Sequence, residues 1–146
     1  MLKDIEGFGG SKPVPVGSQS DERFIRGAYY AQMLPEQPKS YQAAVAGVMS
    51  IMRNMSTPFG MDDPDKPNIS ATRWRTVADC TNKRYYFEFA DMPNVVWVDM
   101  DKLNLSEGSS VQKFNLETHS DASGQVADMF NPTEPPAFIE AGAKVN

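Results

Sequence analysis

The first apolar pattern in the chain has the spacing of an amphipathic helix. It starts at Ser20, whose hydroxyl can cap a helix, and Pro35 ends it. Asp21 and Glu22 occupy the expected first turn, where negative charge suits the positive end of the helix dipole. The apolar positions are Phe24, Ile25, Ala28 and Tyr29. The pattern predicts a helix between Ser20 and Pro35.

A second helix is predicted between Ser40 and Pro58, because apolar residues there form one broad helical face. That face consists of Tyr41, Ala44, Val45, Val48, Met49, Met52 and Met55. Methionines at this spacing fill irregular gaps in a core, so they indicate packing and not a cofactor site.

Beyond a linker rich in Pro and Asp, at 57–68, the period of the apolar positions changes to two. Three such stretches follow, TRWRTVADC, RYYFEFA and VVWVDM, and short polar turns separate them. The pattern predicts an antiparallel meander of three strands.

The two faces of this meander differ. Trp74, Phe87 and Phe89 are expected to bury one face, whereas Val77, Tyr86 and several charges occupy the other. A sheet of this kind packs helices on its apolar face, so the fold class is α+β, with two helices packed on an antiparallel meander.

The chain becomes polar from Ser106 onward. One further strand is expected in VQKFNL, followed by a tail rich in Pro that lies over the surface. We therefore expect a C-terminal strand and an irregular tail at 106–146, distinct from residues 1–105.

Composition narrows the function classes. A chain of 146 residues is long enough for one ordinary domain, and its net charge of -5 argues against nucleic-acid binding. The longest apolar run, 43–52, is far too short to cross a membrane, and the first residues do not resemble a signal peptide. A soluble partner or a small substrate is expected; a cytoplasmic and a periplasmic location both stay open.

No cofactor or metal is expected. Cys80 is the sole cysteine and His119 the sole histidine, so the sequence has no cluster with zinc-type spacing. Cys80 is interpreted as a packing residue of the sheet and His119 as a solvated loop residue. The glycines of GFGG do not have the spacing of a dinucleotide-binding loop.

Arg23 and Arg26 lie next to bulky apolar residues in the first predicted helix. A buried guanidinium needs carboxylates, carbonyls or an anionic sulfur as partners, because leaving it unpaired is costly. Asp21, Glu22 or Asp79 could pair with either arginine, which is a structural explanation; a place in an active site is the other.

An ordered set of motifs resembles the C-terminal part of the choloylglycine hydrolase family, the linear amide C-N hydrolases. The motifs are SDERFIRGAYY, a helix rich in Ala and Met that ends at RNMSTPFG, and TRWRTVADCTNKRYYFEFADMPNVVWVDMDKLNL. The resemblance covers about residues 7–105, and it implies that 1–105 is the C-terminal part of a choloylglycine-hydrolase-like domain. It implies part of the four-layer αββα fold of N-terminal nucleophile hydrolases, and an enzyme of the penicillin V acylase or conjugated bile salt hydrolase type; N-acyl homoserine lactones are further possible substrates.

The resemblance also implies a catalytic role for Arg23, in the polar network around a cysteine that the family exposes as its first residue. Arg26 has no such assignment and is interpreted as structural. Met1 is followed by Leu2, and Cys80 lacks a free α-amino group, so the nucleophile is expected outside this chain. We therefore expect a small amide substrate to bind together with a missing N-terminal half, and the chain to form a homo-oligomer or bind a complementary chain. A noncatalytic or decayed domain that acts through protein contacts is the alternative.

Overall fold

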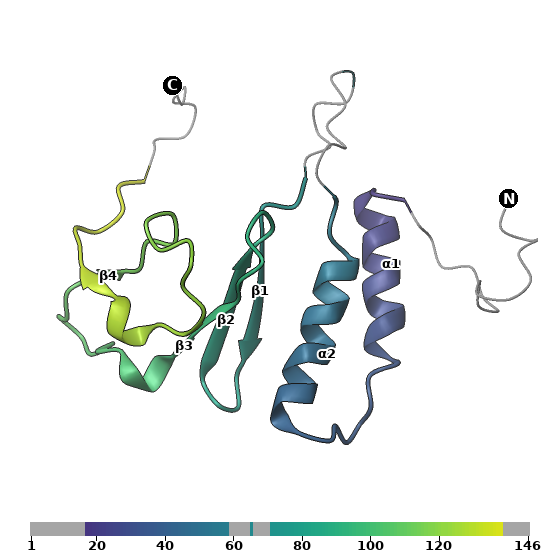
Figure 1. The fold of residues 1–146 in the computed structure, drawn as a ribbon, viewed down its shortest axis with the longest axis horizontal. Helices are drawn as coiled ribbons and strands as arrows, with labels where there is room; N and C mark the ends of the chain where they lie inside the picture. Colours follow the sequence, from purple (N-terminus) through teal and green to yellow (C-terminus); the bar gives the residue numbers. More distant parts are fainter. Residues whose placement is uncertain (1–16, 59–64, 66–70, 139–146) are drawn as a thin grey trace, which may run out of the picture. The chain divides into compact units, whose positions relative to one another are not determined.

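The structure is a computed structural model that describes residues 17–58, 65 and 71–138 (Figure 1). The chain divides into two compact units. One holds the residues up to Val77 with Phe89–Asp91, and the other holds Ala78–Glu88 with the residues from Met92 onward. The predicted linker lies mostly outside the described residues.

Helix α1 spans Ser20–Ala31, close to the prediction. Its N-cap is Gln19 and not Ser20, so the predicted cap is wrong by one residue. The backbone N–H of Gln19 donates to Oε2 of Glu22 at 3.3 Å, so the third residue of the helix helps to cap its start, as in a capping box.

Helix α2 spans Tyr41–Asn54 and begins where the sequence predicts. The Ser40 hydroxyl accepts a hydrogen bond from the backbone N–H of Ala43 at 3.1 Å. Met55 is the C-cap residue. Met49 is buried, as its position on the apolar face predicts.

Helices α1 and α2 lie side by side and make contact (Figure 1). Gly27 lies close to the end of α2, because a Cβ atom added there would lie 2.3 Å from Sδ of Met55. Arg26 and Gly27 are the buried residues of α1. A glycine at this position lets the Met55 side chain pack directly on the α1 backbone.

Replacing Gly27 by Leu should therefore destabilise the helix pair by about 1–3 kcal/mol, although leucine forms helices better than glycine. The added side chain must displace Met55. Urea unfolding followed by circular dichroism measures the change. The exposed Gln42 provides the control, since Gln42→Leu adds a similar side chain where nothing has to move. Equal stability for Gly27→Leu and the parent chain would show that the close approach is absent.

A four-stranded sheet has the order β1-β2-β3-β5. Its strands are β1 Trp74–Asp79, β2 Arg84–Phe89, β3 Val96–Asp99 and β5 Gly124–Gln125. Strands β2 and β3 are antiparallel, and the short connection between β1 and β2 requires the same of that pair. The predicted meander is confirmed. Strand β5, which pairs with β3 in parallel, was not predicted.

The turn between β1 and β2 corrects the interpretation of Cys80. Strand β1 ends at Asp79, whose Oδ1 accepts the backbone N–H groups of Thr81 and Asn82, each at 3.0 Å. This side-chain turn stops the strand one residue before the cysteine. Cys80 is exposed in the turn, so the prediction that it packs within the sheet is wrong.

Burial in the sheet also differs from the prediction. Trp74 is 57% exposed, so it does not bury a face of this sheet. Trp74 is the first residue of β1, and β1 is at one end of the strand order. A residue of such a strand has a neighbouring strand of this sheet on one side only. The buried sheet residues are Tyr86, Glu88, Val96 and Val98.

The remaining elements belong to the second unit. They are the 3-10 helices η1 Met100–Lys102 and η2 Ala127–Met129, and the paired strands β4 Gln112–Lys113 and β6 Asn131–Pro132. Strand β4 confirms only part of the strand predicted in VQKFNL. The Phe114 ring lies 5.4 Å from the His119 ring and 5.9 Å from the Phe130 ring, so His119 is a loop residue that packs, not a fully solvated one.

Arg84 and Asp99 face each other across β2 and β3, and the Nε–H of Arg84 donates to Oδ1 of Asp99. Their side chains are 27% and 23% exposed, against 64% and 73% for the Lys83–Asp101 pair. Because screening by water weakens the exposed pair, Asp99→Asn should lower the free energy of unfolding by about 1 kcal/mol and Asp101→Asn by under about 0.5 kcal/mol. Urea unfolding tests both. Equal losses would contradict the ranking.

Candidate functional site

Arg23 is a half-buried residue in the first turns of α1. Its Nε–H donates to the carbonyl oxygen of Met55 at 2.8 Å. Met55 caps α2, where the last carbonyls have no partner within the helix and carry partial negative charge. One end of the Arg23 guanidinium is therefore fixed by the C-terminus of a neighbouring helix.

A cavity of about 290 Å³ lies beside this anchor, lined by Arg23, Ala71, Thr72, Arg73 and Trp74. The bond to Met55 uses one of the five N–H groups of Arg23, which leaves the four on its two Nη atoms. Within the described ranges these four make no hydrogen bond. Arg23 can therefore offer a fork of donors at this cavity while its Nε stays anchored.

The residues after α2 are in turn hydrogen-bonded to Thr72, which lines the cavity, and to Arg75 in β1. The backbone N–H of Thr57 donates to Oγ1 of Thr72 at 2.9 Å, and the Thr72 N–H returns a bond to the Thr57 carbonyl at 3.0 Å. Nε of Arg75 donates to Oγ of Ser56 at 2.7 Å. This network holds the carbonyl that positions Arg23.

Arg26 occupies a different environment. It is 8% exposed, and its Nη1 donates to the carbonyl oxygen of Gly17 at 2.7 Å, which fastens the segment before α1. It does not line the cavity. Arg23 is likewise bound by a backbone carbonyl, and not by Asp21, Glu22 or Asp79.

The part of the chain that the structure describes supplies no activated nucleophile. Cys80 is exposed in its turn and hydrogen-bonds to no described residue, so it lacks the adjacent base that activates a thiol. Over the same residues, no group of three His, Cys, Asp or Glu side chains could hold a metal ion. The described residues therefore show an anchored arginine at a cavity and no activated nucleophile beside it.

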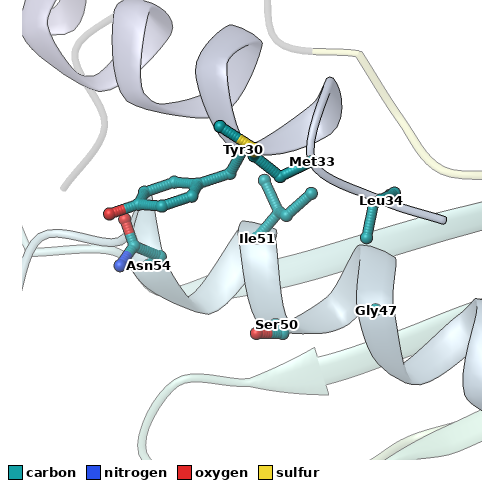
Figure 2. A pocket seen from close by; sticks show the side chains of 7 residues that line it. All are labelled: Tyr30, Met33, Leu34, Gly47, Ser50, Ile51 and Asn54. Atoms are coloured by element: carbon teal, nitrogen blue, oxygen red, sulfur yellow. The ribbon is translucent and has the colours of Figure 1, made fainter. Parts of the chain in front are cut away.

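A second cavity, of about 310 Å³, lies between α1 and α2 (Figure 2). Its lining residues are Tyr30, Met33, Leu34, Gly47, Ser50, Ile51 and Asn54. Figure 2 shows the Tyr30 ring extending toward Asn54, with Ile51 between the two helices. None of these described residues carries a carboxylate, guanidinium, amine or thiol, so they include no group comparable to Arg23.

Comparison with known proteins places these features in a family. The sequence model of the family described as "Linear amide C-N hydrolases, choloylglycine hydrolase family" matches residues 3–127 of this chain. The chain belongs to the choloylglycine hydrolase family. The match extends past residue 105, where the recognisable sequence motifs end.

Two relatives of this choloylglycine hydrolase family member are informative. A penicillin V acylase of Pectobacterium atrosepticum is 37% identical over 145 residues, which cover 90% of this chain and 39% of that protein. The structure of penicillin V acylase from Agrobacterium tumefaciens matches with a TM-score of 0.77 and 40% identity, over 87% of this chain and 41% of that one. The chain therefore spans about two fifths of the length of these relatives.

The structural match confirms the α+β fold class of the N-terminal nucleophile hydrolases. Among the described residues, no helix is long and apolar enough to span a membrane. The sequence pointed to Arg23, but it gave no sign of Met55, Thr57 and Thr72, which fix the arginine. Apart from the Thr72 hydroxyl, the atoms that make these contacts belong to the backbone, and backbone atoms leave no pattern in a sequence.

Proposed function

We propose that this chain is part of an enzyme that hydrolyses a linear amide C-N bond, and that Arg23 is its contribution to the active site. The observation that carries the proposal is the anchored guanidinium at the end of α2, with donors left over at a cavity. Membership of the choloylglycine hydrolase family supplies the reaction class, and two relatives are named penicillin V acylase.

The chemistry of an anchored arginine suits this reaction. Arginine keeps its charge at any physiological pH, and a permanent cation near a thiol lowers the thiol pKa and favours the nucleophilic thiolate. Its Nη donors can also stabilise the negative oxygen that develops when a nucleophile attacks an amide carbonyl. The family resemblance assigns the nucleophile to a cysteine, which the rest of the enzyme would supply.

The partner of this chain in the active enzyme is proposed to be the remaining portion of a choloylglycine hydrolase, as a complementary polypeptide. Two observations support this. The chain spans about two fifths of its relatives, and large apolar side chains stand exposed, with Phe24 72% and Trp74 57% accessible. A homo-oligomer would cover the same residues in another way.

A chimera tests the function. The segment of the Pectobacterium atrosepticum penicillin V acylase that aligns with this chain is replaced by this chain, and hydrolysis of penicillin V is measured. We expect turnover in the chimera and none in this chain alone. A folded chimera that cleaves neither penicillin V, conjugated bile salts nor N-acyl homoserine lactones would contradict the proposal and favour a noncatalytic domain.

A further inference from the structure

Two arginines, Arg23 and Arg73, line the cavity beside α1. Two like charges at one small cavity repel each other, and here they stand in a chain whose net charge is -5. An anion between them would relieve the repulsion. The cavity therefore favours an anion, whereas the net negative charge of the whole chain disfavours one.

The polar side chains among the described residues at this cavity can all donate hydrogen bonds. Arg23 has its two Nη groups available, as described above. Oγ1 of Thr72 accepts the N–H of Thr57, so the hydroxyl proton of Thr72 remains free to donate. The planar fork of a guanidinium matches the two oxygens of a carboxylate, which makes a carboxylate a better fit than a spherical anion.

Two of the described residues at the cavity have apolar side-chain surface. They are Trp74, which is 57% exposed, and Ala71. An indole offers a flat surface on which an aromatic or aliphatic group can stack. A volume of about 290 Å³ is at the lower end for ligand sites, so it has room for a carboxylate with one small apolar group.

We propose that this cavity binds a small organic acid, with the carboxylate between Arg23 and Arg73 and the apolar group of the acid against Trp74. The site can bind such an acid whether or not the proposed hydrolase activity is correct. The two proposals remain connected, because hydrolysis of an amide by water releases one carboxylic acid and one amine. An acid held here would belong to the product class of the reaction.

Titration of the ¹⁵N-labelled full chain with phenylacetate, followed by NMR, tests the site without any assay of hydrolysis. We expect saturable shifts of the Thr72 amide and the Trp74 indole, with a dissociation constant on the order of 1–10 mM, as for a ligand of about ten non-hydrogen atoms. Acetate, which lacks the apolar group, should bind at least about fivefold more weakly, and the neutral phenylacetamide should cause no saturable shift.

Variants locate the interaction. Arg73 is exposed, so Arg73→Gln should leave the fold intact and weaken phenylacetate binding at least about fivefold. Lys113→Gln makes the same change of charge at an exposed residue of β4 and should leave binding unchanged. The proposal is overturned if phenylacetate causes no saturable shift, if acetate or phenylacetamide binds as well as phenylacetate, or if Arg73→Gln binds phenylacetate like the parent chain.

Discussion

Replacing Arg23 by Gln in the active chimera lowers kcat/KM for penicillin V by at least about 100-fold. Loss of one preorganised donor at a developing oxyanion costs about 100- to 1000-fold, and this change also removes the cation that favours a thiolate. The loss should fall on kcat more than on KM, since both effects act on the reacting atoms. Steady-state kinetics at several penicillin V concentrations separates the two constants.

The conservative variant sharpens this test. Arg23→Lys keeps the positive charge. A lysine ammonium, however, lacks the planar guanidinium, which can donate to the Met55 carbonyl through Nε and still offer its Nη donors at the cavity. We expect kcat/KM of the Arg23→Lys chimera to lie between the values of the parent chimera and the Arg23→Gln chimera. Lys113→Gln serves as the charge control and should retain full activity. Normal turnover in a folded Arg23→Gln chimera would refute the role of Arg23.

The second large effect concerns the chain by itself. We expect it to elute in size-exclusion chromatography with light scattering as a species larger than a 16.2 kDa monomer. The physical reason is apolar exposure: Phe24, Met33 and Trp74 are each more than half exposed. Addition of the complementary polypeptide should convert this species to a complex with one copy of each chain.

A variant with a smaller exposed apolar surface provides the control. Phe24→Ser removes the aromatic ring from the exposed side of α1 and should shift the chain toward the monomer, with its helical circular dichroism retained. The proposed partnership would be contradicted if the parent chain is a well-dispersed monomer at high concentration and does not bind the complementary polypeptide.

Local patterns in the sequence predicted the principal elements of the fold. The apolar spacing identified α1 and α2, and the change of period identified β1, β2 and β3. Strand β5 was missed because it is two residues long and begins with Gly124, too short for any alternation to show. The cap of α1 was misplaced by one residue, since Gln19 and Ser20 both offer polar side chains there.

The errors about burial have a common cause. Cys80 and Trp74 both fit the sequence pattern in which every second residue faces the same side of a strand. Both are nevertheless exposed in this structure. Alternation states which residues share a face, but it cannot state where a turn begins or what covers the end of a strand. Asp79 ends β1 before Cys80, and Trp74 lies at the start of a strand at one end of the sheet order.

The candidate site was predictable only in part. Arg23 was identified by its motif, whereas its anchor is the Met55 carbonyl, 32 positions away along the chain. The same holds for the pairing of Thr57 with Thr72. Contacts of this kind arise from the packing of α1 against α2 and from the path of the backbone after α2. A single sequence carries no record of either.

Hydrogen exchange at Nε of Arg23 tests most directly the claim that this guanidinium is fixed at the end of α2. The ¹⁵N-labelled chain gives the Arg23 signal, assigned by its loss in Arg23→Lys, and exposed Arg73 provides the reference. A half-buried Nε–H bound to the Met55 carbonyl should exchange at least about tenfold more slowly than that of Arg73. Equal exchange rates would contradict the account, because Arg23 would then have no fixed place from which to act.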